Sequence, residues 1–309
     1  MSLFFIILFK ISPLYLNVIL GYLSARFLDV KRESIATLLI YILGPMVVFS
    51  ATISVKIDFS IAFIPIFLYI FSSTIAFISL YIWGKSWENP TGNILSFSAG
   101  TGNTGYFGIP LATIFFEPQL ADIYIFAVLS SLLYESTTGF YVTAKGNFSV
   151  RESILKISKL PILYAFILGI IFNIYGFEIP KELSDYSSGF KSSYGILGMM
   201  MLGMGLMGLK NSKDNFDLKF ITITFIIKFI FWPLSMLLFI YLDKNIFQIL
   251  NDDLYKVLFL FAIVPLAGNT VTLAVLLNAK PQKASLAVFL STVVSILFIP
   301  LAIYLYGAF

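Results

Sequence analysis

Long apolar stretches, separated by short polar segments, make up most of this chain. A transmembrane helix needs about 20 mainly apolar residues. Ten stretches come near that length, at residues 3–25, 34–53, 61–83, 93–116, 122–144, 160–177, 190–209, 218–242, 255–278 and 284–306. The pattern therefore predicts an all-α membrane protein with ten transmembrane helices. The polar segment 178–191 predicts a short interfacial piece between the sixth and seventh of them.

Two of the ten stretches are interrupted near their middle by the same three residues. Gly102-Asn103-Thr104 interrupts the fourth, and Gly268-Asn269-Thr270 interrupts the ninth. Pro110 and the four glycines within 100–108 disfavour a continuous helix in the first case, and Pro265 does so in the second. Irregular backbone at membrane depth is tolerated only where it is buried in protein or lines a watery cavity. Paired interruptions in corresponding halves of a chain indicate the binding site of a transporter.

The two halves of the chain also resemble each other in their first helices. Segments 13–21 and 161–169 both begin with proline and end with glycine. Five helices per half is an odd number, so the second half must enter the membrane in the opposite direction. We therefore predict two inverted five-helix repeats, residues 1–144 and 160–309, joined by a cytoplasmic connection at 145–159.

Composition agrees with this interpretation and narrows the chemistry. The chain is 59% hydrophobic and 12% charged, whereas soluble domains carry about 25% charged residues. It has no cysteine and no histidine, so we expect no disulfide, no metal site and no cofactor. The net charge of +4 is spread over scattered lysines and arginines, which predicts cytoplasmic loops rather than nucleic-acid binding.

The distribution of basic residues predicts the orientation, because cytoplasmic loops are enriched in lysine and arginine. The loops after even-numbered helices hold only Lys56, Lys181, Lys191, Lys244 and Lys256. The loops after odd-numbered helices hold Arg26, Lys31, Arg32, Lys85, Lys145, Arg151, Lys156, Lys159, Lys210, Lys213, Lys219, Lys280 and Lys283. We therefore expect a multi-pass protein of the cell membrane with both termini outside.

The residues at the two interruptions form the predicted substrate site. Half-helices that begin after such a break direct free N–H groups and a positive dipole inward, which suits a carboxylate. Asparagine and threonine add neutral donors and acceptors. The alternative is that glycine permits close helix packing while Asn and Thr link neighbouring helices. The predicted substrate-binding residues are Gly102, Asn103, Thr104, Tyr106, Gly268, Asn269 and Thr270, with Pro110 and Pro265 as the helix-breaking residues.

Two ionisable residues lie well inside predicted helices. Glu135 is in the fifth and Lys228 is in the eighth. Charged groups at membrane depth are costly and are candidates for function. Glu135 and Lys228 are therefore candidates for proton or ion coupling, and the alternative is a structural ion pair between the two. The seventh helix combines methionines with Gly195, Gly198 and Gly203, which predicts close helix packing rather than a metal path.

Several of these motifs resemble the auxin efflux carrier family of permeases, in particular its bacterial malate/malonate-transporter-like branch. The resemblance covers nearly the full length. It rests on Pro13 to Gly21, Leu43-Gly44-Pro45, Asn103 to Leu111, Val264-Pro265 with Gly268-Asn269, and Ser291 to Ser295 with Pro300.

The resemblance implies a fold like that of bile acid symporters and sodium–proton antiporters, with ten helices in two inverted repeats. Helices one, two, six and seven would form a scaffold, often dimeric, and helices three to five and eight to ten a moving transport bundle. The broken fourth and ninth helices would cross, with Asn103, Thr104 and Pro265 near the substrate. The middle connection is short, unlike the long loop of the plant hormone carriers.

The leading hypothesis is therefore a secondary transporter that moves a small organic anion, a carboxylate, across the lipid bilayer by alternating access. A passive channel is an alternative, although no ring of charge or repeated carbonyl filter is visible. A membrane sensor without transport is another. An enzyme is not expected, because the membrane-embedded residues offer no acid–base pair and no metal constellation. A homodimer through helices one, two, six and seven is the expected assembly.

Overall fold

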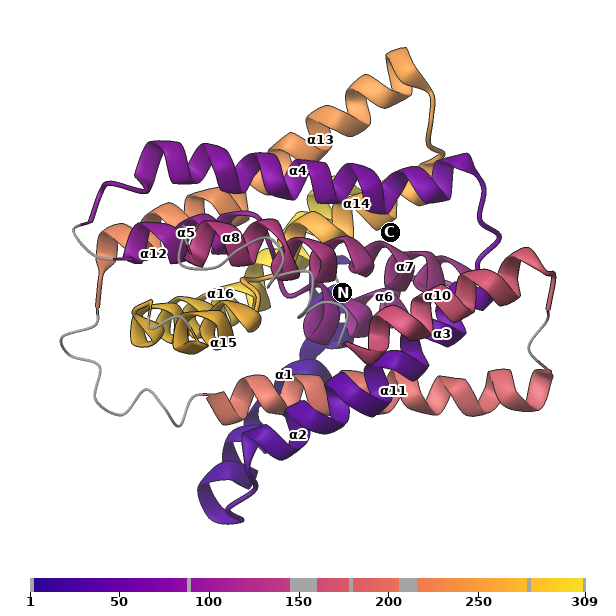
Figure 1. Ribbon diagram of the computed structural model, residues 1–309, viewed down its shortest axis with the longest axis horizontal. Coiled ribbons are helices and arrows are strands. Elements are labelled where there is room, and N and C mark those ends of the chain that lie inside the picture. The colour runs from indigo at the N-terminus through magenta and orange to yellow at the C-terminus, as the bar shows by residue number, and fades with distance from the viewer. Residues whose placement is uncertain are drawn as a thin grey trace.

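A computed structural model describes residues 3–87, 90–144, 160–177, 180–205, 216–276 and 279–307. These residues form helices and connecting segments, and none of them lies in a β-strand (Figure 1). The predicted connection at 145–159 and the basic residues Lys210 and Lys213 lie outside the described ranges.

Six helices in the described part of the chain are long and apolar enough to cross a membrane. Some of them consist of consecutive helical pieces. They are α1 (Leu3–Phe27), α2–η1–α3 (Arg32–Leu38, Leu39–Leu43, Gly44–Ser54), α4 (Phe59–Trp83), α7–α8 (Pro118–Ser136, Thr138–Ala144), α12–η5–α13–η6 (Leu218–Ile226, Ile227–Phe231, Trp232–Leu242, Asp243–Phe247) and α16 (Pro281–Tyr306).

The remaining helices are shorter or more polar. They are α5 (Thr91–Ala99), the π-helical turn η2 (Thr104–Gly108), α6 (Ile109–Phe115), α10 (Pro161–Ile174), α11 (Lys181–Met204), α14 (Asp252–Ile263) and α15 (Asn269–Leu276). A separate piece between the sixth and seventh stretches is not present from Lys181 onward, because α11 runs without interruption from Lys181 to Met204. The polar segment continues directly into the glycine-rich second half of this helix, where the helix packs closely.

Helices α1, α3, α10 and α11 form one group. The most extensive packing in the molecule joins α1 to α11 and α3 to α10. Glycines allow the first pair to approach closely: a Cβ on Gly21 would collide with the Met200 carbonyl, and a Cβ on Gly203 would collide with the Val18 carbonyl. The predicted close packing of the seventh apolar stretch is therefore present between these two helices.

Helix α2 and η1 pack against α11 and belong with the first group. The remaining helices pack around α5 and α14. Every residue of α5 is buried, and so are nine of the twelve residues of α14. Helix α4 packs against α5 and α7, and α13 packs against α14. Helix α16 packs against α15 within this group and against α1 of the first group. The two sequence interruptions follow α5 and α14, so they lie in the interior.

Polar contacts fix one end of this second group. Asp217 caps α12 and accepts hydrogen bonds from the Phe220 N–H (3.0 Å), Trp87 Nε1 (2.9 Å) and Lys283 Nζ (2.6 Å). Burial alone would raise the pKa of Asp217, but these hydrogen bonds outweigh it and hold the pKa below its usual value. The contacts tie the ends of α4, α12 and α16 together.

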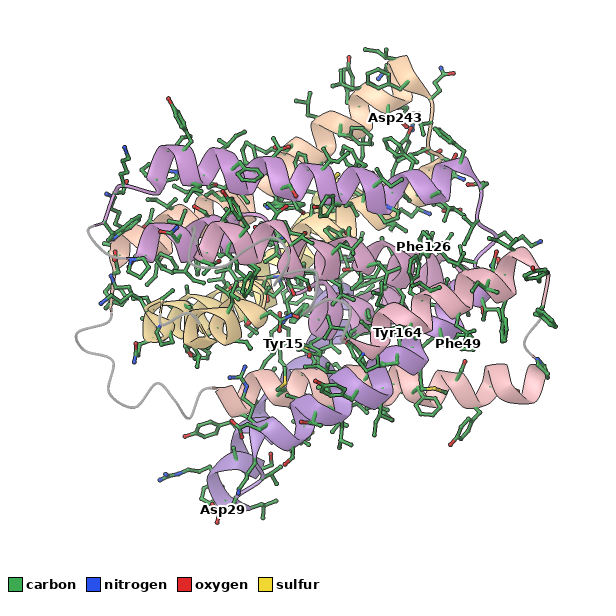
Figure 2. All side chains as sticks on the ribbon, in the orientation of Figure 1. Tyr15, Asp29, Phe49, Phe126, Tyr164 and Asp243 are labelled. Carbon is green, nitrogen blue, oxygen red and sulfur yellow. The ribbon has the colours of Figure 1, made fainter. Side chains whose placement is uncertain are left out.

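The connections lie at two opposite edges of the molecule. In Figure 1, α4 and α12 have ends at the left, whereas the α3–α4 turn lies at the right. Figure 2 shows Asp29, in the α1–α2 turn, and Asp243, at the end of α13, at opposite corners of this view. Asp243 is fully buried, and its carboxylate accepts hydrogen bonds from the N–H groups of Ile249 and Leu250.

Candidate functional site

The first interruption begins where α5 ends. Helix α5 stops at Ala99, and helical structure resumes at Thr104 with the π-helical turn η2. The Ala99 carbonyl, which has lost its partner in the helix, accepts a hydrogen bond from Trp232 Nε1 at 2.8 Å. Pro110 lies at the second position of α6, directly after η2, and has no N–H to donate to that turn. It therefore lies within the half-helix that begins at Thr104 and not in the unwound segment.

The second interruption follows α14. This helix ends at Ile263, and α15 begins at Asn269. Pro265 lies inside the unwound segment between them. The N–H of Leu266 donates to Ser291 Oγ on α16 at 3.1 Å. This backbone group, which has no partner within a helix of its own, is therefore satisfied by the neighbouring helix.

The two interruptions contact each other directly. The backbone N–H of Asn103 donates to the carbonyl of Pro265 at 2.8 Å. This hydrogen bond satisfies one donor of the first break with one acceptor of the second. Residues far apart in the sequence therefore meet at one point in the interior.

Glu135 connects the two interruptions a second time. Its carboxylate accepts a hydrogen bond from Thr101 Oγ1 at 2.9 Å and another from Asn269 Nδ2 at 2.6 Å. Glu135 lies on the last turn of α7, just before the irregular residue Thr137 separates α7 from α8. Both donors are neutral, so the carboxylate has no counter-ion among the described residues.

Three buried polar atoms near the crossing lack a hydrogen-bond partner within the described structure. They are Asn103 Nδ2, Thr270 Oγ1 and Lys228 Nζ. In contrast, Thr104 Oγ1 donates to Ser131 Oγ at 2.9 Å. Buried polar groups are satisfied in the great majority of cases, so an unsatisfied donor indicates a group reserved for another partner.

A cavity of about 170 Å³ adjoins the crossing. One side consists of polar or backbone groups from the two breaks and α7, and the other consists of apolar residues of the first helix group. The lining residues include Gly102, Asn103, Thr104, Gly105, Tyr106, Ser131, Glu135, Ala267, Gly268, Asn269, Leu39, Val47, Ile162 and Tyr194.

The structure brings most of the predicted site residues together. Of the seven predicted substrate-binding residues, all except Thr270 line this cavity; the two proline residues and Lys228 do not line it. The alternative in which Glu135 and Lys228 form a structural ion pair is wrong. Glu135 is held by Thr101 and Asn269 instead, and Lys228 Nζ has no partner among the described residues.

Other lining residues were not identified from the sequence as site residues, and Ser131 and Tyr194 are two examples. Ser131 lies one helical turn before Glu135, so both face the same side of α7. The four-residue spacing from Glu135 could therefore have identified Ser131 from the sequence. Tyr194 comes from α11, and its ring lies 5.5 Å from that of Tyr106 between centroids. No sequence pattern links Tyr194 to the breaks, because its position depends on how the two helix groups pack.

The arrangement can bind a small polar molecule. Among the described residues, no three histidine, cysteine, aspartate or glutamate side chains come together as a possible metal site. Multiple long apolar helices around two broken, enclosed ones define a multi-pass membrane protein with a polar site in its interior.

Comparison with known protein families agrees with this class. The sequence profile of the family described as membrane transport protein matches residues 147–303, just over half of the 309 residues. The chain belongs to this family, which includes the auxin efflux carriers. A comparison with curated proteins finds no match. The protein is therefore a multi-pass membrane transport protein.

Proposed function

We propose that the protein is a secondary carrier of a small organic anion, a carboxylate, working by alternating access around the crossed breaks. The observation that supports this most is the hydrogen bond from the Asn103 N–H to the Pro265 carbonyl, which joins two interrupted helices beside a small cavity. Crossed discontinuous helices at an internal site are the binding architecture of many secondary transporters.

The helix packing supports an inverted repeat of two five-helix units. Counting ten membrane-crossing segments, α1 is the first, α3 belongs to the second, and α10 and α11 are the sixth and seventh. The first packs on the seventh and the second on the sixth. A two-fold relation between the halves exchanges first with sixth and second with seventh, so it requires these two pairings to occur together. These four segments are the proposed scaffold and carry the proposed dimer surface.

The remaining segments form the proposed transport bundle, which moves against the scaffold. The two groups pack on each other through α1 and α16 and through α3 and α7, and discrete polar contacts also join them. Tyr15 of α1, labelled in Figure 2, is hydrogen-bonded to Ser295 of α16 at 2.8 Å. Lys191 of α11 forms an ion pair with Asp122 of α7. Discrete contacts of this kind can break and reform when one bundle rocks against the other.

The chemistry of the cavity favours an anion accompanied by a proton. Asn103 Nδ2 is a buried donor without a partner among the described residues, and it lies on the cavity wall. Glu135 lies on the same wall. A substrate carboxylate and the Glu135 carboxylate would repel each other in this cavity, because little water is present to screen their charges. Binding is therefore favourable only when one of the two holds a proton. Glu135 is therefore the proposed proton-coupling residue.

Purified protein in proteoliposomes tests the carrier. A thermal-shift screen of mono- and dicarboxylates selects ligands, and counterflow of the selected ligand then measures exchange. A carrier gives saturable uptake that is accelerated by unlabelled substrate on the opposite side. Flux that does not saturate and shows no counterflow would indicate a channel. Ligand binding without any flux would indicate a sensor.

Replacing Glu135 by Gln tests the coupling. We expect Glu135→Gln to abolish uptake driven by a pH gradient while exchange of substrate for substrate continues, because only net transport needs the proton to bind and leave. The control is Glu117→Gln, at the exposed start of α7. Gradient-driven uptake that survives in Glu135→Gln would exclude Glu135 as the coupling group.

A further inference from the structure

Lys228 is a buried cation that the proposed transport mechanism has not used. It lies in the π-helical turn η5, between α12 and α13, and is 1% exposed. Its ammonium lies 4.6 Å from the centre of the Trp232 ring. It has no hydrogen-bond partner within the described structure. A buried ammonium without compensation costs many kcal/mol, so its surroundings must supply favourable electrostatics.

The ammonium lies where the two interruptions meet. A Cβ placed on Gly102 would collide with Lys228 Nζ, and it would lie 2.9 Å from Val264 Cγ2. Gly102 is three residues beyond the end of α5, and Val264 directly follows the end of α14. Lys228 Nζ is therefore adjacent to the segments that leave the C-terminal ends of both half-helices.

Helix C-termini carry a partial negative charge of about half an electron, which favours a nearby cation. In transporters with broken helices, such ends and the unwound carbonyls beside them bind the coupling sodium ion or proton. Here the corresponding cation belongs to the chain itself. Trp232 helps to hold it in place, since its ring faces the ammonium while its Nε1 is anchored on the Ala99 carbonyl.

We propose that the Lys228 ammonium is a built-in cation of the helix crossing, which takes the place of a bound sodium ion and makes the carrier independent of sodium. The proposal deepens the proposed carrier function and rests on it for the transport result. Its structural part concerns the stability of the crossing and can be measured without any substrate.

The competing explanation is that Lys228 contributes only the packing of its aliphatic stem. The two explanations predict opposite effects for Lys228→Met, which keeps the stem and removes the charge. If only packing matters, relieving a buried charge raises the melting temperature. If the ammonium compensates the two helix ends, its removal lowers the melting temperature.

The test compares purified wild-type protein, Lys228→Met and Lys228→Gln in sodium chloride and in choline chloride of equal ionic strength. We expect the wild-type melting temperature to be the same in both salts. In choline we expect both variants to melt about 5 °C or more below the wild type, a shift that corresponds to a few kcal/mol. Lys228→Gln, which vacates the ammonium position and adds a carbonyl oxygen, should recover part of the loss in sodium. Lys244→Gln, at an exposed lysine, should change nothing in either salt.

Transport then separates this proposal from the carrier function. We expect wild-type proteoliposomes to transport equally well with sodium and with choline. Sodium-dependent wild-type transport, or a Lys228→Met variant as stable as the wild type in choline, would overturn the role of Lys228. If no carboxylate is transported at all, the proposed function fails, and the melting temperatures still decide whether Lys228 stabilises the crossing. A Lys228→Met variant that cannot be purified, while Lys244→Met can, supports the stabilising role.

Discussion

The two Gly-Asn-Thr triplets are identical in sequence but have complementary environments. At the first break the side-chain Nδ2 of Asn103 has no partner in the described structure, whereas Thr104 Oγ1 donates to Ser131. At the second break Asn269 donates to Glu135, whereas Thr270 Oγ1 lacks a partner. Within the part of the chain that the structure describes, each triplet has one polar side chain with a hydrogen-bond partner and one with a donor that lacks a partner.

The difference arises from α7, which contacts a different side chain of the triplet at each break. Ser131 and Glu135 are four residues apart and therefore project from one face of this helix. Ser131 engages the threonine of the first break, and Glu135 engages the asparagine of the second. A repeated motif thus supplies a free donor on one side and holds a carboxylate on the other. Sequence symmetry need not imply chemical symmetry.

The largest effect is expected from the glycines that begin the triplets. A Cβ on Gly102 would collide with Lys228 Nζ and crowd Val264, whereas a Cβ on Gly268 would meet only the flexible Leu202 side chain at 3.3 Å. We expect Gly102→Ala to abolish transport and to lower the free energy of unfolding by about 1–3 kcal/mol, the usual cost of overpacking. Gly268→Ala should retain most of its transport and stability. Equal losses in uptake and thermal denaturation would contradict this asymmetry.

Substitutions of the two asparagines should affect different properties, transport in one case and stability in the other. Asn103→Ala removes a donor that has no partner among the described residues, so we expect stability to stay unchanged while kcat/KM falls about 10- to 100-fold, as for a lost hydrogen bond to a charged ligand. Asn269→Ala leaves Glu135 short of a donor, and we expect it to lower stability by about 1–3 kcal/mol and to alter the pH dependence of uptake. Asn245→Ala, at an exposed asparagine, is the control for both. A large stability loss in Asn103→Ala would show that its amide is structural.

The threonines should give the smallest effects, with opposite signs. Thr104→Val loses the hydrogen bond to Ser131, so the free energy of unfolding should fall by about 1 kcal/mol. Thr270→Val replaces a buried hydroxyl that lacks a partner in the described structure, and the protein should become slightly more stable. Chemical denaturation of the purified variants measures both changes. A destabilised Thr270→Val would mean that its hydroxyl does have a partner in the membrane.

Much of this arrangement could be predicted from local sequence. Apolar stretches of suitable length indicated the membrane-crossing helices, of which six in the described part of the chain are long and apolar enough to cross a membrane. Glycine and proline located the breaks between α5 and α6 and between α14 and α15, since both residues weaken the interior of a helix. Glu135 stood out because a carboxylate in an apolar helix is rare.

The partners of these groups could not be predicted in the same way. Pairing Glu135 with Lys228 relied on charge alone, and the structure places neutral donors on Glu135 instead. Tyr194 enters the cavity because α11 packs beside the first break, and that packing depends on contacts between distant segments. The contact between Asn103 and Pro265 uses only main-chain atoms, so side-chain chemistry does not record it.

That main-chain contact has a consequence for genetics. A scan that replaces each side chain by alanine leaves the Asn103 N–H and the Pro265 carbonyl in place, so whatever effects it finds nearby, it does not measure the hydrogen bond that joins the two breaks. Only a change to the backbone itself reaches it, such as proline at position 103 or an amide-to-ester exchange there. A side-chain substitution that is tolerated near this point would therefore not show that the main-chain hydrogen bond is unimportant, because the substitution leaves that bond in place.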